Sequence, residues 1–148
     1  MQHEAMVASL KAIKMYGMAQ AVDDLANQGS PAYQSAQEML GSLLKAEMAE
    51  REVRSISYQM KSARFPVYRD LSSFDFSQST VNEALVRQLH RCEFMDQVHN
   101  VVLVGGPGTG KTHLATALGV QAVQHQHRRV RFFSTIELVN ALELEKGA

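Results

Sequence analysis

The chain has 148 residues, of which 45% are hydrophobic and 20% charged, a composition typical of a globular protein and not of a disordered one. Its 15 basic and 15 acidic residues balance, so the net charge favours no nucleic-acid or membrane partner, and only local charge patterns can. The single cysteine, Cys92, excludes an internal disulfide and fits a reducing compartment.

The N-terminal region has a helical pattern. Between Gln2 and Gln28, apolar residues recur at the three-and-four spacing of one helix face, which predicts a single helix. Lys11 and Lys14 interrupt the apolar stretch, so it lacks the apolar core of a signal peptide. No segment approaches the roughly 20 apolar residues that span a bilayer. We therefore expect a soluble, cytoplasmic protein with no membrane partner.

A glycine and a proline separate this helix from a second one. We expect Gly29 to end the first helix, and Ser30 to cap a second that runs from about Ala32 to Arg64. Pro66 disfavours helical angles at the residue before it and ends this pattern. The sequence thus predicts a helical N-terminal domain over residues 1–66.

Basic residues follow one another along the second helix. Four of them fall on one side of a helical wheel: Arg51, Arg54, Lys61 and Arg64. An apolar arc lies beside them, so the helix is amphipathic with a basic flank. Such a stripe can follow the backbone of duplex DNA without reading its sequence, and it makes binding salt-dependent. The alternative is a solvated face that only keeps the protein soluble.

The middle of the chain alternates between loop and helix. A polar loop with two aromatic residues, Phe74 and Phe76, follows the N-terminal domain. A third helix is predicted over residues 80–92, where Thr80 and Glu83 have the spacing of a capping box.

From residue 100 the pattern changes to that of a parallel sheet. Val101–Val104 is a short apolar run, as expected of a strand buried on both faces. The elements expected after it are a helix over 111–126, a strand over 130–133 and a helix from about 137, capped by Ser134 or Thr135. This order predicts an α/β fold, in which the start of a parallel-sheet domain occupies residues 67–148.

Residues 105–112 read GGPGTGKT, a full match to the phosphate-binding loop pattern. Glycines let the backbone N–H groups curl into a concavity for phosphate oxygens, backed by the positive end of the next helix. Lys111 would reach the β- and γ-phosphates of ATP, and the Thr112 hydroxyl would bind Mg²⁺. The predicted ATP site is Gly105, Gly106, Pro107, Gly108, Thr109, Gly110, Lys111 and Thr112.

Other parts of a phosphate-loop hydrolase are missing from the sequence. Hydrolysis needs an acidic residue for Mg²⁺, a group that orients water and usually an arginine. After Thr112 the acids are Glu137, Glu143 and Glu145, and none follows an apolar strand pattern. Two strands are also too few for a stable sheet domain. We expect the front portion of a larger, truncated ATPase.

Several short stretches occur in the order seen in one family. They are Tyr16-Gly17-Met18-Ala19, Ala63-Arg64-Phe65-Pro66, Phe74-Asp75-Phe76, the run from Val101 to Ala115, and Val130-Arg131-Phe132-Phe133-Ser134. This order resembles the IstB-type helper ATPases of bacterial insertion sequences, relatives of the DnaC-type helicase loaders. The resemblance implies an AAA+ fold, ATP-dependent self-assembly on DNA and a transposase partner. It also implies that the segment around Phe74-Asp75-Phe76 lies near the nucleotide base.

The chain departs from that family by lacking the acidic Walker B motif, the polar sensor and the arginine finger. We therefore predict no catalytic residue. The leading hypothesis is an ATP-binding helper of DNA transposition that binds duplex DNA and assists a transposase. Two alternatives stay open: a fragment of a helicase loader, and a non-catalytic fragment that binds DNA or sister subunits.

Overall fold

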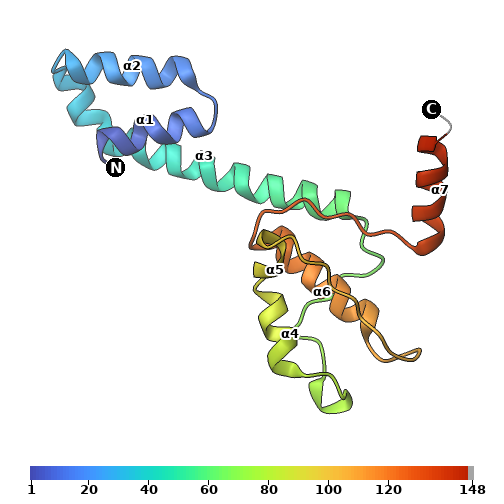
Figure 1. Ribbon diagram of the computed structural model, residues 1–148. Helices are drawn as coiled ribbons and strands as arrows, with labels where there is room; N and C mark the ends of the chain where they lie inside the picture. The colour runs from blue at the N-terminus through green and yellow to red at the C-terminus, as the bar shows by residue number, and fades with distance from the viewer. Residues whose placement is uncertain (147–148) are drawn as a thin grey trace. The chain divides into compact units, whose positions relative to one another are not determined.

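The computed structural model describes residues 1–146, and its regular elements are helices joined by turns and loops (Figure 1). They are α1 (His3–Ala12), α2 (Tyr16–Asn27), α3 (Pro31–Ala63), the short 3₁₀ helix η1 (Phe76–Gln78), α4 (Glu83–His90), α5 (Glu93–Asp96), α6 (Lys111–Gln124) and α7 (Thr135–Lys146). The chain divides within α3 into two compact units, Met1–Ser55 and Ile56–Ala148. Gly147 and Ala148, which end the predicted second domain, lie outside the described residues.

The predicted α/β fold is wrong, because 66% of the described residues are helical and none of them forms a strand. The run Val101–Val104 is not a strand, but its side chains still alternate between partly buried and exposed. Val102 and Val104 are 80% and 91% exposed, whereas Val101 and Leu103 are partly buried. Apolar, β-branched residues favour a half-buried strand, but a strand also needs hydrogen bonds to the backbone of a neighbouring strand.

The second predicted strand, 130–133, bonds to a helix end instead. The Phe132 N–H donates to the carbonyl oxygen of Ala63 at 2.8 Å, and the Arg131 guanidinium donates to that of Ser62 at 2.9 Å. The last carbonyl groups of a helix have no partner inside it, so these two bonds satisfy the end of α3. Tertiary partners of this kind cannot be read from a local apolar pattern.

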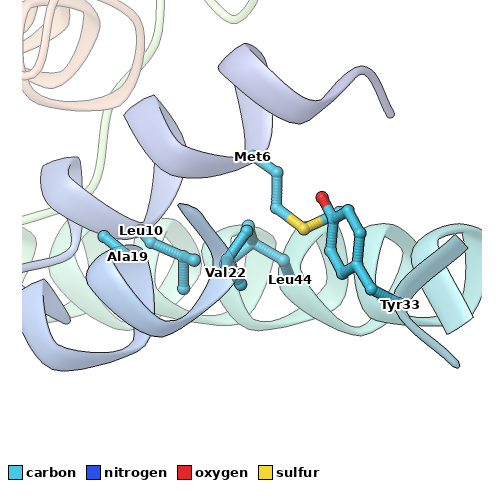
Figure 2. Close-up of a cluster of buried hydrophobic side chains, with 6 residues drawn as sticks. All are labelled: Met6, Leu10, Ala19, Val22, Tyr33 and Leu44. Atoms are coloured by element: carbon cyan, nitrogen blue, oxygen red, sulfur yellow. The ribbon is translucent and has the colours of Figure 1, made fainter. Parts of the chain in front are cut away.

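In the unit Met1–Ser55, α1 and α2 pack together and against α3. Figure 2 shows the buried cluster that joins them: Met6, Leu10, Ala19, Val22, Tyr33 and Leu44. His3 links the same three helices by hydrogen bonds, since its Nδ1 lies 2.9 Å from the Tyr33 hydroxyl and its Nε2 lies 2.8 Å from Asp23 Oδ1. The apolar periodicity of this region therefore does build a core.

The single helix predicted over residues 2–28 is instead two helices. Lys14 has φ 64°, its N–H donates to Lys11 O at 3.0 Å, and the Met15 N–H donates to Leu10 O at 2.8 Å. These are the two bonds of a Schellman motif, which usually has glycine in the left-handed position. Because lysine and not glycine occupies this position, the sequence did not indicate that the helix would end here.

The end of α2 and the start of α3 are as predicted. Gly29 has φ 60° and its N–H donates to Ala26 O at 3.0 Å, which closes α2. The Ser30 hydroxyl accepts from the Tyr33 N–H at 3.4 Å at the start of α3.

None of the helices in residues 1–146 is both long and apolar enough to cross a membrane.

In the unit Ile56–Ala148, α6 supplies most of the core, and its extent confirms the predicted helix. Its buried residues are Leu114, Thr116, Ala117, Val120, Ala122 and Val123. Gly119 faces Phe65, because a Cβ atom on Gly119 would stand 2.8 Å from Phe65 Cε1. Val86 of α4 and Cys92 are also buried, and burial raises the pKa of the Cys92 thiol.

Two helix starts test the predicted caps. The predicted start at Thr80 is wrong, because α4 begins at Glu83 and Asn82 Oδ1 accepts from the Leu85 N–H at 3.0 Å. For α7, one of the two predicted caps is confirmed. The Ser134 hydroxyl accepts from the Glu137 N–H at 3.2 Å, while Glu137 Oε2 accepts from the Ser134 N–H at 2.9 Å. This reciprocal pair is a capping box.

Candidate functional site

The glycine-rich loop leads directly into the N-terminus of α6. Gly110 is the N-cap residue with φ 85°, and Gly108 has φ 71°. Both angles lie in the left-handed region, which glycine adopts without strain. The first N–H groups of a helix have no partner inside it, and with the helix dipole they favour an anion at that end. The local geometry therefore suits a phosphate group.

The Lys111 side chain folds back over this loop. Its Nζ donates to Gly106 O at 2.5 Å and to Thr109 Oγ1 at 3.3 Å. The Thr109 hydroxyl in turn donates to Gly106 O at 2.8 Å. These bonds hold the ammonium charge at the loop, where an incoming phosphate would compete with the Gly106 carbonyl for it. Thr112, the next residue of α6, is exposed.

Phe74 forms a wall beside Gly110. A Cβ atom on Gly110 would stand 2.6 Å from Phe74 Cε2, so the ring lies against the glycine backbone. The ring centroid is 4.9 Å from that of Phe76 and 5.2 Å from that of His113, both in edge-to-face geometry. A pocket of about 360 Å³ opens here, lined by Phe74, Asp75, Gln78, Ser79, Thr80, Gly108, Thr109 and Gly110.

Two carboxylates in the loop before η1 are held ionised. Hydrogen bonds from Ser77 lower the pKa of Asp75, and hydrogen bonds from Ser72 and Ser73 lower the pKa of Asp70. Asp75 lines the pocket, whereas Lys111 lies at the loop. The negative charge of Asp75 disfavours a phosphate on the Phe74 side, so phosphates fit better at the Lys111 side.

The glycine-rich loop and its neighbours offer few side chains that could bind a metal ion. Among residues 1–146, no group of three or more His, Cys, Asp or Glu side chains could hold one. Mg²⁺ keeps several waters and binds through substrate phosphates with few protein ligands. The Thr112 hydroxyl therefore suits the accompanying ion of a nucleotide, but not a metal centre built from the protein alone.

In the unit Met1–Ser55, two residues of the predicted basic stripe form ion pairs. Arg51 Nε lies 2.6 Å from Glu47 Oε1, and Arg54 Nη2 lies 3.3 Å from Glu50 Oε1. Arg51 also donates to Ile13 O at 2.9 Å. These glutamates partly neutralise the two arginines. The i, i+4 spacing of each pair is visible in the sequence and would have revealed them.

In the unit Ile56–Ala148, a third basic residue, Arg131, lies at the same end of α3 as the other two residues of the stripe. Lys61 and Arg64 are exposed, and Lys61 forms no ion pair within the described part of the chain. Arg131 joins this end of α3 through its bond to Ser62 O, which the sequence did not predict. The pKa of Glu137 is lowered by hydrogen bonds from Ser134 and further by Arg64 and Arg131, so one carboxylate offsets part of this charge.

Comparison with known proteins identifies the family. The family model described as IstB-like ATP binding protein matches residues 8–148. The chain is 37% identical, over 73% of its length, to a protein of insertion sequence IS5376 from Geobacillus stearothermophilus. It is 38% identical over 80% of its length to a protein of insertion sequence IS21 from Pseudomonas aeruginosa. Both relatives are named for ATP binding.

A third relative, an insertion-sequence protein of Mycobacterium tuberculosis also named for ATP binding, is 30% identical over 90% of the chain. The matched regions cover 43%, 45% and 53% of these three relatives, so the chain spans about half their length. The match includes the glycine-rich loop of residues 105–112 and confirms the resemblance seen in the sequence. The chain belongs to the IstB-like ATP-binding protein family.

Proposed function

We propose that this chain binds ATP with residues 105–112 and is the ATP-binding part of a helper protein for DNA transposition. The observation that supports it best is the position of Lys111, whose ammonium lies over the glycine-rich loop at the N-terminus of α6. Its relatives, named as ATP-binding proteins of insertion sequences, support the same assignment.

Each part of the loop has its own task in this proposal. The N–H groups of Gly106 and of Gly108 to Thr112 bind phosphate oxygens, with the α6 dipole behind them; Pro107 has no N–H to donate. Lys111 leaves the Gly106 carbonyl and binds the β- and γ-phosphates. The Thr112 hydroxyl takes one ligand position of Mg²⁺, and the nucleotide and water take the others. When bound, Mg²⁺ neutralises part of the triphosphate charge.

We further propose that the chain contacts duplex DNA without sequence preference. Lys61 and Arg64 are exposed with one nearby carboxylate, so they are the stronger candidates for phosphate contacts. Arg51 and Arg54 contribute less, because each forms an ion pair with a glutamate. The complete protein would assemble with sister subunits on DNA in the cytoplasm and assist a transposase.

The test is a parallel measurement of ATP binding and turnover with radiolabelled ATP on the purified chain. We expect binding without turnover above background, since the acids after Thr112, which are Glu137, Glu143 and Glu145, follow no apolar strand pattern that would place one of them at Mg²⁺. Lys111→Ala should abolish most of the binding. Turnover at the rate of an ordinary AAA+ protein would refute the prediction of missing catalytic groups, and absence of binding would refute the proposed function itself.

A further inference from the structure

His113 connects the first turn of α6 to the loop that contains Phe74. Its Nε2–H donates to the carbonyl oxygen of Asp70 at 2.9 Å, and the Ser73 hydroxyl lies 3.3 Å from the same nitrogen. The imidazole also meets the Phe74 ring edge to face, with an interplanar angle of 88°. One side chain of α6 therefore contacts both the backbone and the aromatic ring of the 70–74 segment.

That segment determines the shape of the pocket beside Gly110. Phe74 lies against Gly110, and Phe76 packs edge to face on Phe74. The carboxylates of the 70–76 loop bond to serines two or three residues away, so they hold the loop together but do not attach it to α6. Within the described residues, the bonds of His113 to Asp70 and Ser73 thus form the polar link between this loop and the helix that begins at Lys111.

The pocket differs in chemistry from the phosphate loop next to it. An aromatic ring forms one wall, and the polar side chains of Gln78, Ser79 and Thr80 form another. A nucleoside has the matching features, which are a flat aromatic base and polar edges on its base and sugar. Inorganic phosphates have neither, so only a complete nucleotide would use this pocket.

We propose that His113 is a positioning residue. The family resemblance already implies that the segment around Phe74 lies near the nucleotide base; His113 holds this 70–76 loop against Gly110, so that the nucleoside half of a nucleotide fits beside Phe74 while its phosphates lie on residues 105–112. The inference rests on the proposed function, since it requires phosphates at that loop. It predicts that loss of His113 weakens binding of the nucleoside half alone, whereas a general structural role would weaken every ligand.

The experiment compares two ligands, magnesium-ATP and magnesium-tripolyphosphate, by calorimetric titration of the purified chain. We expect His113→Ala to lower ATP affinity on the order of tenfold while tripolyphosphate affinity stays unchanged. His113→Gln should restore ATP affinity, because its Nε2 can donate to the Asp70 carbonyl. His125→Ala, at the other end of α6, is the matched control and should bind both ligands as the unaltered chain does.

Four outcomes decide the matter. Selective loss of ATP affinity with rescue by glutamine supports the inference. Equal loss for both ligands, or an unchanged ATP affinity, refutes it while leaving the phosphate loop assignment intact. If His113→Ala fails to fold, Phe74→Leu should show the same selective loss, and its absence refutes the inference. An unaltered chain that binds neither ligand refutes the proposed function, and this inference with it.

Discussion

The Phe74 ring lies against the backbone of Gly110, so closely that a Cβ atom on residue 110 would stand 2.6 Å from Phe74 Cε2 and 3.2 Å from Cζ. Gly110 also has φ 85°, an angle that side-chain-bearing residues rarely adopt. One glycine thus allows both the loop conformation and the approach of an aromatic ring from a segment far away in sequence.

Gly110→Ala tests this relationship. The added methyl group must displace Phe74 and strain the backbone, which costs on the order of 1–3 kcal/mol. We expect ATP affinity to fall about tenfold or more, measured by calorimetric titration. Gly17→Ala is the control, because a Cβ atom on Gly17 would have no neighbour within 4 Å and alanine favours the helix α2. Equal effects of the two changes would contradict the argument.

Duplex DNA binding should depend more on the end of α3 than on its middle. Lys61→Glu with Arg64→Glu should weaken binding to a random duplex, and each lost phosphate contact should reduce the salt dependence by a slope of about one. Fluorescence anisotropy over a salt titration measures both quantities.

The control for this prediction is Arg51→Glu with Arg54→Glu, which changes the charge by the same amount. Its effect should be smaller, since both arginines already pair with glutamates. Equal losses would mean that only net charge matters. If the variant at Lys61 and Arg64 bound DNA with unchanged affinity, these residues would not contact DNA and would only help to keep the protein soluble.

The capping box of α7 predicts a pH effect. Hydrogen bonds from Ser134 lower the pKa of Glu137 below its ordinary 4.5. The contribution of the ionised carboxylate to helix stability is therefore present above about pH 4.5, and it is lost as the pH falls through the lowered value. Ser134→Ala removes the hydroxyl but keeps the backbone N–H that lowers the pKa of Glu137 most, so this pKa should rise only part of the way towards its ordinary value, as measured by carboxyl-carbon NMR. No rise would contradict the capping geometry.

The core of the unit Met1–Ser55 should be sensitive to loss of volume. Met6 is 1% exposed, and its replacement by alanine leaves a cavity that should lower the free energy of unfolding by about 2–5 kcal/mol. Met39 is 63% exposed, so Met39→Ala should change it by no more than about 0.5 kcal/mol. Urea denaturation measures both, and equal effects would show that Met6 is not in a tight core.

Local chemistry predicted several helix ends correctly, although the capping box expected at Thr80 was wrong because Asn82 caps α4. Ser30 and Ser134 cap helices that the sequence placed correctly, and Gly29 ends α2. In each case the responsible groups lie within a few residues of one another. The break at Lys14 was missed, because a lysine in the left-handed position has no local sequence signature.

Features that depend on distant partners were not predicted. The Val101–Val104 run has the side chains of a strand but no strand neighbour among residues 1–146. For the site, the sequence placed the loop at the start of α6, but it gave no sign that Asp70 and Ser73 would bond to His113. Such contacts join residues about forty positions apart, and no local pattern encodes them.

The loop of residues 105–112 is proposed to bind a triphosphate through its backbone N–H groups, which every residue of the loop except Pro107 has. The most direct test is to titrate magnesium-ATP into the ¹⁵N-labelled chain and follow its amide resonances. We predict that the largest shifts occur between Gly106 and Thr112, and that Lys111→Ala removes most of them. ATP binding that leaves those resonances unmoved, or no spectral change at saturating ATP, would contradict the claim.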